Sequence, residues 1–192
     1  MPVALEPAAR ELVLRGRRLT LRRFTEADIT ERYLAWLSDP DVNRYSRRLG
    51  QPPVSAAAAR RYLAGLAPDE VVLAIDLEPE GHVGNLKFGP VDRAAGRADI
   101  SIVIGEKSAW GRGVGTEAVY LVSRYLFEEL GLERLDAGSG NPAFIAMVEG
   151  LGWRREKVPR AHVRAGDRLL DWTLLAQRRG EFRRRPELEA LP

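Results

Sequence analysis

Apolar and polar residues alternate along several short segments of the chain, which predicts β-strands. The clearest is 97–104, RADISIVI, where Asp99, Ser101 and Val103 alternate with isoleucines. Segment 19–24, LTLRRF, alternates in the same way and predicts a half-buried strand. The letters EPEG separate two apolar runs and predict a strand–turn–strand unit. The further strands are expected at 70–77, 82–88, 132–138 and 167–177.

Other segments carry their apolar residues at helical spacing. The first of these helices is expected to begin at the N-cap Thr25 and to stop at Pro40. Gly131 is expected to end a later one, because glycine readily adopts the conformation that closes a helix. The predicted helices are 25–40, 55–66, 116–130 and 141–152.

This order of elements predicts a mixed α/β (α+β) domain: a strand, two helices, a three-strand meander, and then strand–helix–strand–helix–strand. No internal repeat divides the chain, and 192 residues suit one domain with a sizeable core. We expect a single domain over residues 1–182. The Arg- and Glu-rich residues 183–192 are expected to form a loosely ordered tail.

Composition narrows the function classes. Hydrophobic residues make up 45% and charged residues 30%, as in globular proteins. The chain has no cysteine, and His82 and His162 match no metal-ligand spacing, so we expect neither a disulfide nor a metal site. We see no membrane-spanning run and no signal-peptide pattern, and we expect a cytoplasmic protein.

The charge balance says little about macromolecular partners. The formal net charge is only +3, and the arginines fall in small clusters such as 15–18 and 183–185. Small clusters are typical of a solvated surface, so we do not expect nucleic acid or a membrane as a partner. An anionic small ligand is compatible with this surface, and the sequence allows a homodimer.

The most informative stretch is SAWGRGVGTEA, residues 108–118, which carries Gly111, Gly113 and Gly115 between a strand and a helix. Bare backbone N–H groups at a helix N-terminus form a natural anion site. A nucleotide P-loop would need a lysine before Thr116, and a dinucleotide loop would need G-x-G-x-x-G spacing; neither is present.

A third template fits better. The stretch resembles the Q/R-x-x-G-x-G/A pyrophosphate loop of the GNAT acetyltransferases, and the order of elements from about Leu19 to about Phe182 resembles that fold as well. The likeness is greatest to the branch of ribosomal-protein N-terminal and amino-sugar acetyltransferases. Three other segments carry it: YLAWLSDPDVNRY, HVGNLKFGPV, and Asn141 with the later GLGW. The resemblance implies a mixed central sheet with an antiparallel N-terminal meander and helices on both faces.

The resemblance also implies acetyl-CoA as cosubstrate. The loop would hold its pyrophosphate, with Gly113 and Gly115 leaving room for the phosphates and Arg112 adding a charge-assisted contact or remaining solvated. The preceding strand would pair with the pantetheine arm, and Asn141 would reach that arm, cap the next helix, or do both. The residues implied for acetyl-CoA are Ile102, Val103, Ile104, Trp110, Gly111, Arg112, Gly113, Val114, Gly115, Thr116 and Asn141.

The sequence departs from the family pattern at two positions. Phe144 stands where the family often has serine, and Val148 stands where it often has the tyrosine that protonates the leaving thiolate. A CoA thiol is acidic enough to leave with little help, so the departure does not exclude activity.

The implied reaction is direct attack of a primary amine on the acetyl thioester, which needs a base or a water relay. Asp99 is the first candidate base, with an ion pair to Arg97 as its alternative role. Glu106 is the second, whereas Glu117 is expected to serve the helix N-terminus. His82 and His162 are weaker candidates.

Acceptor contacts are predicted by analogy with the same family. Asp171 would bind a substrate amine or pair with Arg160. The early segment that contains Tyr33 and Arg44 would shape the pocket, although most of its aromatic residues are expected to pack in the core. The residues expected to contact the acceptor are Trp36, Asn43, Tyr45, Asn85 and Asp171.

Three functions remain open from the sequence. The first is N-acetylation of a small-molecule amine such as a nucleotide-linked amino sugar, and the second is N-acetylation of a protein N-terminus. The third is a non-catalytic CoA-binding or nucleotide-sensing module, or a basic RNA-associated domain.

Overall fold

A mostly antiparallel sheet runs through the molecule, with strand order β1-β2-β3-β4-β5-β6-β9-β7 and β8 paired to β9. The computed structural model describes residues 12–46, 50–157, 161–165 and 167–190. The strands are β1 Val13–Arg15, β2 Leu19–Arg23, β3 Val71–Leu77, β4 Gly81–Asp92, β5 Arg97–Ile104, β6 Arg134–Ser139, β7 Arg154–Arg155, β8 Ala161–Ala165 and β9 Arg168–Arg178. The helices are α1 Glu31–Ser38, α2 Ala56–Ala64, α3 Val114–Arg124 and α4 Pro142–Gly150.

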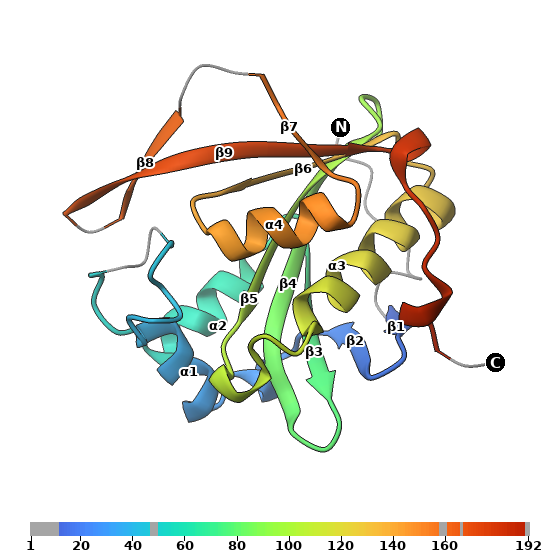
Figure 1. Cartoon of the computed structure of the whole chain (residues 1–192). Coiled ribbons are helices and arrows are strands. Elements are labelled where there is room, and N and C mark those ends of the chain that lie inside the picture. Colours follow the sequence, from blue (N-terminus) through green and yellow to red (C-terminus); the bar gives the residue numbers. More distant parts are fainter. Residues whose placement is uncertain (1–11, 47–49, 158–160, 166, 191–192) are drawn as a thin grey trace.

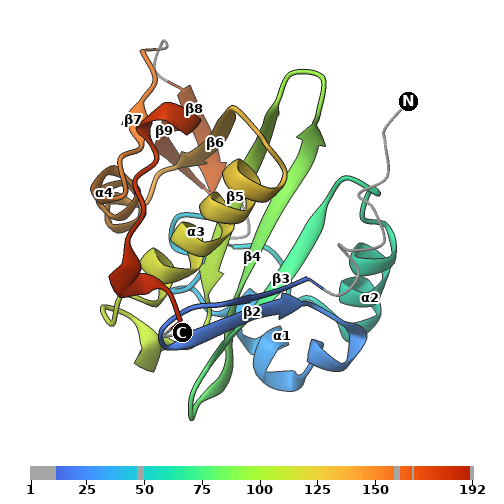
Figure 2. The same cartoon turned by 90° about the vertical axis from the view of Figure 1, so that its right-hand side faces the viewer.

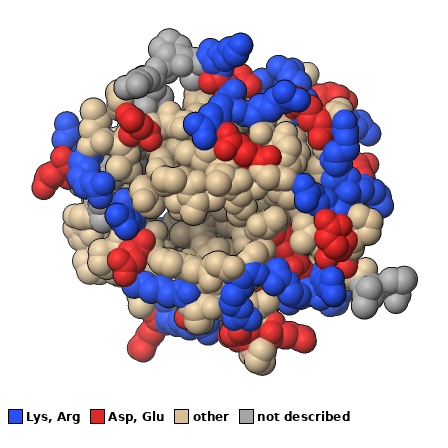
Figure 3. Space-filling model, in the orientation of Figure 1, with Lys and Arg blue, Asp and Glu red and all other residues tan. Residues whose placement is uncertain are grey.

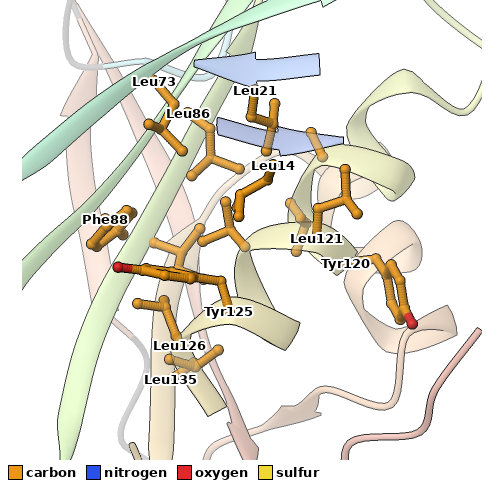
Figure 4. Packing of buried hydrophobic residues seen from close by; sticks show 14 of the residues in the cluster. Leu14, Leu21, Leu73, Leu86, Phe88, Tyr120, Leu121, Tyr125, Leu126 and Leu135 are labelled. Atoms are coloured by element: carbon orange, nitrogen blue, oxygen red, sulfur yellow. The ribbon is translucent and has the colours of Figure 1, made fainter. Parts of the chain in front are cut away.

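Helices cover both faces of the sheet, as predicted. Helices α1 and α2 lie on one face, and α3 and α4 lie on the other (Figures 1 and 2). The core under α3 and α4 contains fully buried residues such as Leu21, Leu86, Leu121 and Leu135 (Figure 4). A smaller cluster that includes Phe24 and Ala74 lies under α1 and α2. Burial of one such large side chain contributes about 1.5–3 kcal/mol, so these two layers hold the helices against the sheet.

The start predicted for the first helix was wrong. Instead of a helix from Thr25, the chain forms a 3-10 turn, Glu26–Asp28, and α1 begins after the N-cap Thr30. The cause is Asp28, whose carboxylate accepts hydrogen bonds from the Thr25 backbone at 2.7 Å and from Arg22 of β2 at 2.7 Å. These bonds fix the first turn to the sheet, so the helix starts only after it.

The later elements agree more closely with the periodicity. Helix α3 begins at Val114, two residues earlier than predicted, and continues into a π-helical turn, Tyr125–Glu129. Gly131 follows with φ +68°, as expected for a helix stop. Strand β4 runs to Asp92, beyond the predicted end at residue 88.

The structure places residues 183–190, expected to form a loose tail, along α3. The Tyr120 hydroxyl of α3 accepts a hydrogen bond from the Arg185 backbone at 2.9 Å and donates one to Glu189. Glu189 also forms an isolated bridge with Gly16, beside β1. Among the described residues, no helix is both long and apolar enough to cross a bilayer.

The feature that positions the site is the short parallel contact between β5 and β6. Their pairing covers only Arg97–Asp99 of β5 and Arg134–Asp136 of β6. Beyond Asp99 the two strands diverge (Figure 1). The rest of β5 therefore has a strand neighbour on one side only, namely β4.

Candidate active site

The glycine loop leaves the end of β5 and opens α3. Gly111 and Gly113 have φ of +72° and +77°, in the left-handed region that favours glycine. Gly113 is the N-cap of α3. At Gly115 a Cβ atom would lie 3.0 Å from the Met147 sulfur of α4. The sequence interpretation explained Gly113 and Gly115 by room for phosphates; the fold itself already requires glycine at 111 and 113 and favours a small residue at 115.

Side-chain hydrogen bonds brace this loop. Arg112 donates to Glu80 at 2.6 Å, and its own carbonyl accepts from Arg18 at 2.6 Å. The Trp110 indole donates to the carbonyl of Ile104 at 2.8 Å. Arg112 is thus engaged in an ion pair with Glu80, and its contact with phosphate stays a prediction.

The residues predicted to pair with pantetheine belong to the part of β5 that is not paired with β6. Ile102, Val103 and Ile104 are partly exposed, past the point where pairing with β6 ends. In the orientation of Figure 3, an uncharged hollow lies near the centre of the face, with Lys, Arg, Asp and Glu around it. An unpaired strand edge offers N–H and C=O groups to an extended ligand. Pairing with pantetheine stays a prediction, and the geometry is compatible with it.

Asn141 caps α4, one of the two roles considered for it. Its side-chain oxygen accepts from the Ala143 backbone at 3.0 Å, while its amide nitrogen makes no hydrogen bond to a described residue. The two departures from the family pattern lie on the same helix. Val148 is fully buried in the core, and Phe144 packs against that core. Neither side chain carries a hydroxyl that could protonate the leaving thiolate.

A cavity of about 630 Å³ opens where β5 and β6 diverge, near the predicted base. Ligand sites for small molecules commonly have volumes of this size. Charged side chains from strands far apart in sequence converge on it. The polar and aromatic residues that line it are Glu70, Lys87, Arg97, Asp99, Ser101, Arg134, Asp136, Glu156 and Trp172.

Asp99, the first candidate base, lines this cavity. Burial raises the pKa of its carboxyl, the negative charge of Asp136 raises it further, and Arg97 lowers it. Asp136 is its Cα partner across the strand pair. One oxygen of Asp136 accepts from Arg134 at 2.7 Å, and the other is buried without a hydrogen-bond partner among the described residues.

Glu106, the second candidate, lies beyond the end of β5 and caps a 3-10 turn. Its carboxylate pairs with Arg32 at 2.9 Å and accepts from the Ser108 hydroxyl at 3.1 Å. Burial raises the pKa of Glu106, but the Ser108 hydrogen bonds and the Arg32 charge outweigh it, so the net shift is downward. Its ion pair and low pKa suit a base less well than the environment of Asp99 does.

The early acceptor candidates do not line the cavity. Trp36 is buried and packs so close to Gly105 that a Cβ there would lie 2.0 Å from the indole. Asn43 closes the end of α1 by donating to the Trp36 carbonyl at 2.9 Å. Tyr45 lies under the guanidinium of Arg44. The burial of Trp36 agrees with the expectation that aromatic residues of this segment pack in the core, and the acceptor contacts of the three residues stay predictions.

The other two acceptor candidates are also outside the cavity lining. Asn85 is opposite Val103, and its side-chain oxygen is buried without a hydrogen-bond partner in the described residues. Asp171 pairs with His162 at 3.1 Å and is 81% exposed. Arg160, its other expected partner, lies outside the described residues. The next residue along, Trp172, is the one that lines the cavity.

Sequence reasoning missed the charged residues of the cavity other than Asp99. They are Glu70, Lys87, Arg97 as a ligand-facing residue, Arg134, Asp136 and Glu156. Lys87 lies on the same strand face as the predicted Asn85, two residues further on. Asp136 stands in the predicted strand 132–138, but its closeness to Asp99 depends on the parallel pairing. The periods of β4 and β5 were the signals that could have found Lys87 and Arg97.

The family follows from these observations and one comparison. A diverging parallel strand pair, a glycine loop at the free strand end and helices on both faces occur together, and the sequence model of the Acetyltransferase (GNAT) domain matches residues 18–154. The chain belongs to the GNAT acetyltransferase family. The protein is therefore an acetyl-CoA-dependent acetyltransferase, and the non-catalytic alternative is set aside.

Individual relatives agree with this assignment. The acetyltransferase is 28% identical to the uncharacterized N-acetyltransferase p20 of Bacillus licheniformis over 183 residues, covering 86% of this chain and 95% of the relative. Its fold is similar to the spermidine N-acetyltransferase of Vibrio cholerae in complex with CoA and spermine (TM-score 0.75, 16% identity, covering 85% and 97% of the two chains). A GCN5-related N-acetyltransferase from Brucella melitensis is also similar (TM-score 0.73, 21% identity, 89% and 80% covered).

Proposed function

We propose that the protein transfers the acetyl group of acetyl-CoA to a primary amine of a small molecule, by direct attack of the amine on the thioester. The acceptor class that fits best is an amino sugar, including one linked to a nucleotide. The observation that carries this proposal is the cavity beside Asp99, about 630 Å³ in volume, at the point where the free edge of β5 begins.

The glycine loop and the free edge would hold acetyl-CoA. Backbone N–H groups of the loop and the N-terminus of α3 favour the pyrophosphate. The unpaired part of β5, residues 100–104, would hydrogen-bond the pantetheine arm and bring the thioester toward Asp99. A backbone N–H of this strand would polarise the thioester carbonyl as charge develops on its oxygen.

Asp99 would accept the proton of the acceptor ammonium or orient a water that does so. Its environment supports this role, since burial and the charge of Asp136 both raise its pKa toward the range useful for a base. The chain offers no tyrosine at Val148, so the CoA thiolate would leave without that acid.

A thiol-release assay with acetyl-CoA tests the proposal directly. The acceptors to compare are glucosamine, an aminoglycoside, and a peptide with a free N-terminal alanine or serine. We expect release with at least one amino sugar. Exclusive acetylation of the peptide would instead establish the protein N-terminal alternative. Failure of acetyl-CoA to bind in calorimetry would overturn the assignment of the loop.

Asp99→Asn supplies the matched chemical test. Loss of a positioned base typically lowers turnover 10²- to 10⁴-fold, and we expect a loss in this range with little change in acetyl-CoA affinity. Asp92→Asn, on an exposed carboxylate at the end of β4 and outside the cavity lining, is the control and should retain full turnover. Undiminished turnover in the Asp99 variant at neutral pH would remove Asp99 as the base.

A further inference from the structure

The charged residues of the cavity form two rows across β5 and β6. Arg97 is the Cα partner of Arg134, and Asp99 is the Cα partner of Asp136. Like charges directly opposite each other destabilise a sheet, so the fold tolerates an unfavourable arrangement here. The rows are two residues apart along each strand, about 6.6 Å, and therefore lie on the same face.

The β6 half of this arrangement is neutralised within the protein. Arg134 binds Asp136 at 2.7 Å and reaches Glu156 at 3.4 Å. On the other wall of the cavity, Lys87 binds Glu70 at 2.6 Å. Each of these side chains already has a partner of opposite charge.

The β5 half is not neutralised. Arg97 and Asp99 line the cavity with part of each side chain accessible to solvent, so the burial that raises the pKa of Asp99 is only partial. Neither makes a side-chain hydrogen bond or an ion pair with any residue that the structure describes, although Arg97 lowers the pKa of Asp99 through space. The cavity thus presents one guanidinium and one carboxylate, about 6.6 Å apart along β5, that are available to a ligand.

Their order along β5 fixes which end of an acceptor each one meets. The strand runs from Arg97 through Asp99 to the free edge at 100–104 and then to the glycine loop. If the pantetheine arm follows that edge, the thioester lies next to Asp99, and Arg97 lies on the far side. An amine at Asp99 therefore has Arg97 behind it, away from acetyl-CoA.

We propose that the acceptor carries an anionic group, a phosphate or a carboxylate, on the side of its amine remote from acetyl-CoA, and that Arg97 binds this group. The inference rests on the proposed function and makes its substrate class narrower. A guanidinium binds both oxyanions through paired hydrogen bonds, and Arg97 has all of its donors free of described partners. A second ammonium at the same place would be repelled by Arg97.

Matched acceptors test this directly. The pairs are glucosamine against glucosamine 6-phosphate, and propylamine against 3-aminopropylphosphonate and 4-aminobutyrate, with spermidine as a dicationic amine. A charge-assisted contact makes a difference of about 10- to 100-fold in kcat/KM. We expect the anionic member of each pair to be acetylated faster by this factor, and the phosphonate and carboxylate probes then identify which oxyanion fits.

Variants of Arg97 test whether this residue causes the preference for anionic acceptors. Arg97→Gln should bring the ratio between anionic and neutral acceptors close to one. The ratio is the readout because the substitution also removes a positive charge that lowers the pKa of Asp99, which affects both kinds of amine. Arg97→Lys should keep part of the preference, since it keeps the charge and loses the paired geometry. Arg93→Gln, an exposed arginine outside the cavity lining, is the matched control and should leave the ratio unchanged.

The outcomes separate this inference from the proposed function. Equal rates for anionic and neutral amines, a clear preference for spermidine, or an equal loss for both in Arg97→Gln would overturn the anionic acceptor and leave the acetyltransferase proposal standing. Absence of thiol release with every small amine would overturn the small-molecule proposal itself, and the anionic acceptor with it.

Discussion

Arg18 and Glu117 join the first hairpin to the helix that opens at the glycine loop. The Glu117 carboxylate is fully buried and accepts from the backbone and the side chain of Arg18 at 2.8 and 3.0 Å. The same guanidinium donates to the carbonyl of Arg112 within the loop. Gly16 must be small here, because a Cβ atom would lie 2.4 Å from a Glu117 oxygen. The predicted role of Glu117 at the helix N-terminus therefore coincides with a hydrogen-bonded link between β1, β2 and α3.

Glu117→Gln should destabilise the fold by about 2 kcal/mol. The amide nitrogen would face the donors of Arg18, and a buried hydrogen bond to a charged group contributes in this range. Urea unfolding at pH 7 measures the change. Glu128→Gln is the matched control: its pair with Arg184 is largely exposed and should shift stability by less than about 0.5 kcal/mol. Equal effects of the two substitutions would contradict the structural role of Glu117.

Alanine substitutions in the glycine loop should have unequal effects. Gly113→Ala forces a side chain into φ +77° beside the Arg18 guanidinium, which costs about 1 kcal/mol and distorts the loop. Gly115→Ala meets only the sulfur of the flexible Met147 side chain, which is able to shift. We expect a clear loss of acetyl-CoA affinity by calorimetry for position 113 and a smaller one for 115. The reverse order would mean that Gly115 is the glycine the phosphates require.

The charge of Asp136 should be visible in the titration of Asp99. Burial and the Asp136 charge raise the pKa of Asp99, so Asp136→Asn, which removes the second cause, should lower it. An NMR titration of the Asp99 carboxyl carbon in both proteins measures the shift. Asp171→Asn, which removes a carboxylate outside the cavity lining, should leave the titration unchanged. If the pKa of Asp99 does not fall in Asp136→Asn, the charge of Asp136 does not act on Asp99.

The raised pKa of Asp99 also determines the direction in which the free energy of unfolding changes with pH. Because the folded-state pKa of Asp99 lies above its unfolded value, its contribution to stability is fully present below the unfolded pKa and is lost as pH rises through the folded one. Asp99→Asn should therefore be more stable than the wild type at pH 7, and the difference should vanish in acid. Urea unfolding at several pH values tests this. A variant that is less stable at neutral pH would show that Asp99 supports the fold.

Local periodicity predicted the parts of the site that lie on one continuous segment. The alternation of 97–104 identified both the strand and the outward position of Asp99, and the glycines identified the turn into α3. The cavity could not be predicted in this way. Lys87 and Arg134 line the same cavity as Asp99 only because β4 and β6 are both neighbours of β5, and strand order is a tertiary property. The helix start predicted at Thr25 was wrong for a related reason, because Asp28 is bound by Arg22 of the preceding strand β2.

Tyr120 helps to hold the C-terminal segment on α3, and Tyr120→Phe should loosen this contact at a cost of about 1 kcal/mol. The ion pair between Arg124 of α3 and Glu189 remains in the variant. The hydroxyl bonds Arg185 and Glu189, whereas the ring stacks on Phe182 and should stay in place. Burial chiefly raises the pKa of Tyr120 to about 12, so its contribution to stability holds below pH 10 and is lost between pH 10 and about 12. Absorbance titration should show one late tyrosine fewer in the variant, which keeps Tyr125, whose pKa is also raised by burial. The exposed Tyr62→Phe is the control, and equal stability losses in the two variants would refute this role of Tyr120.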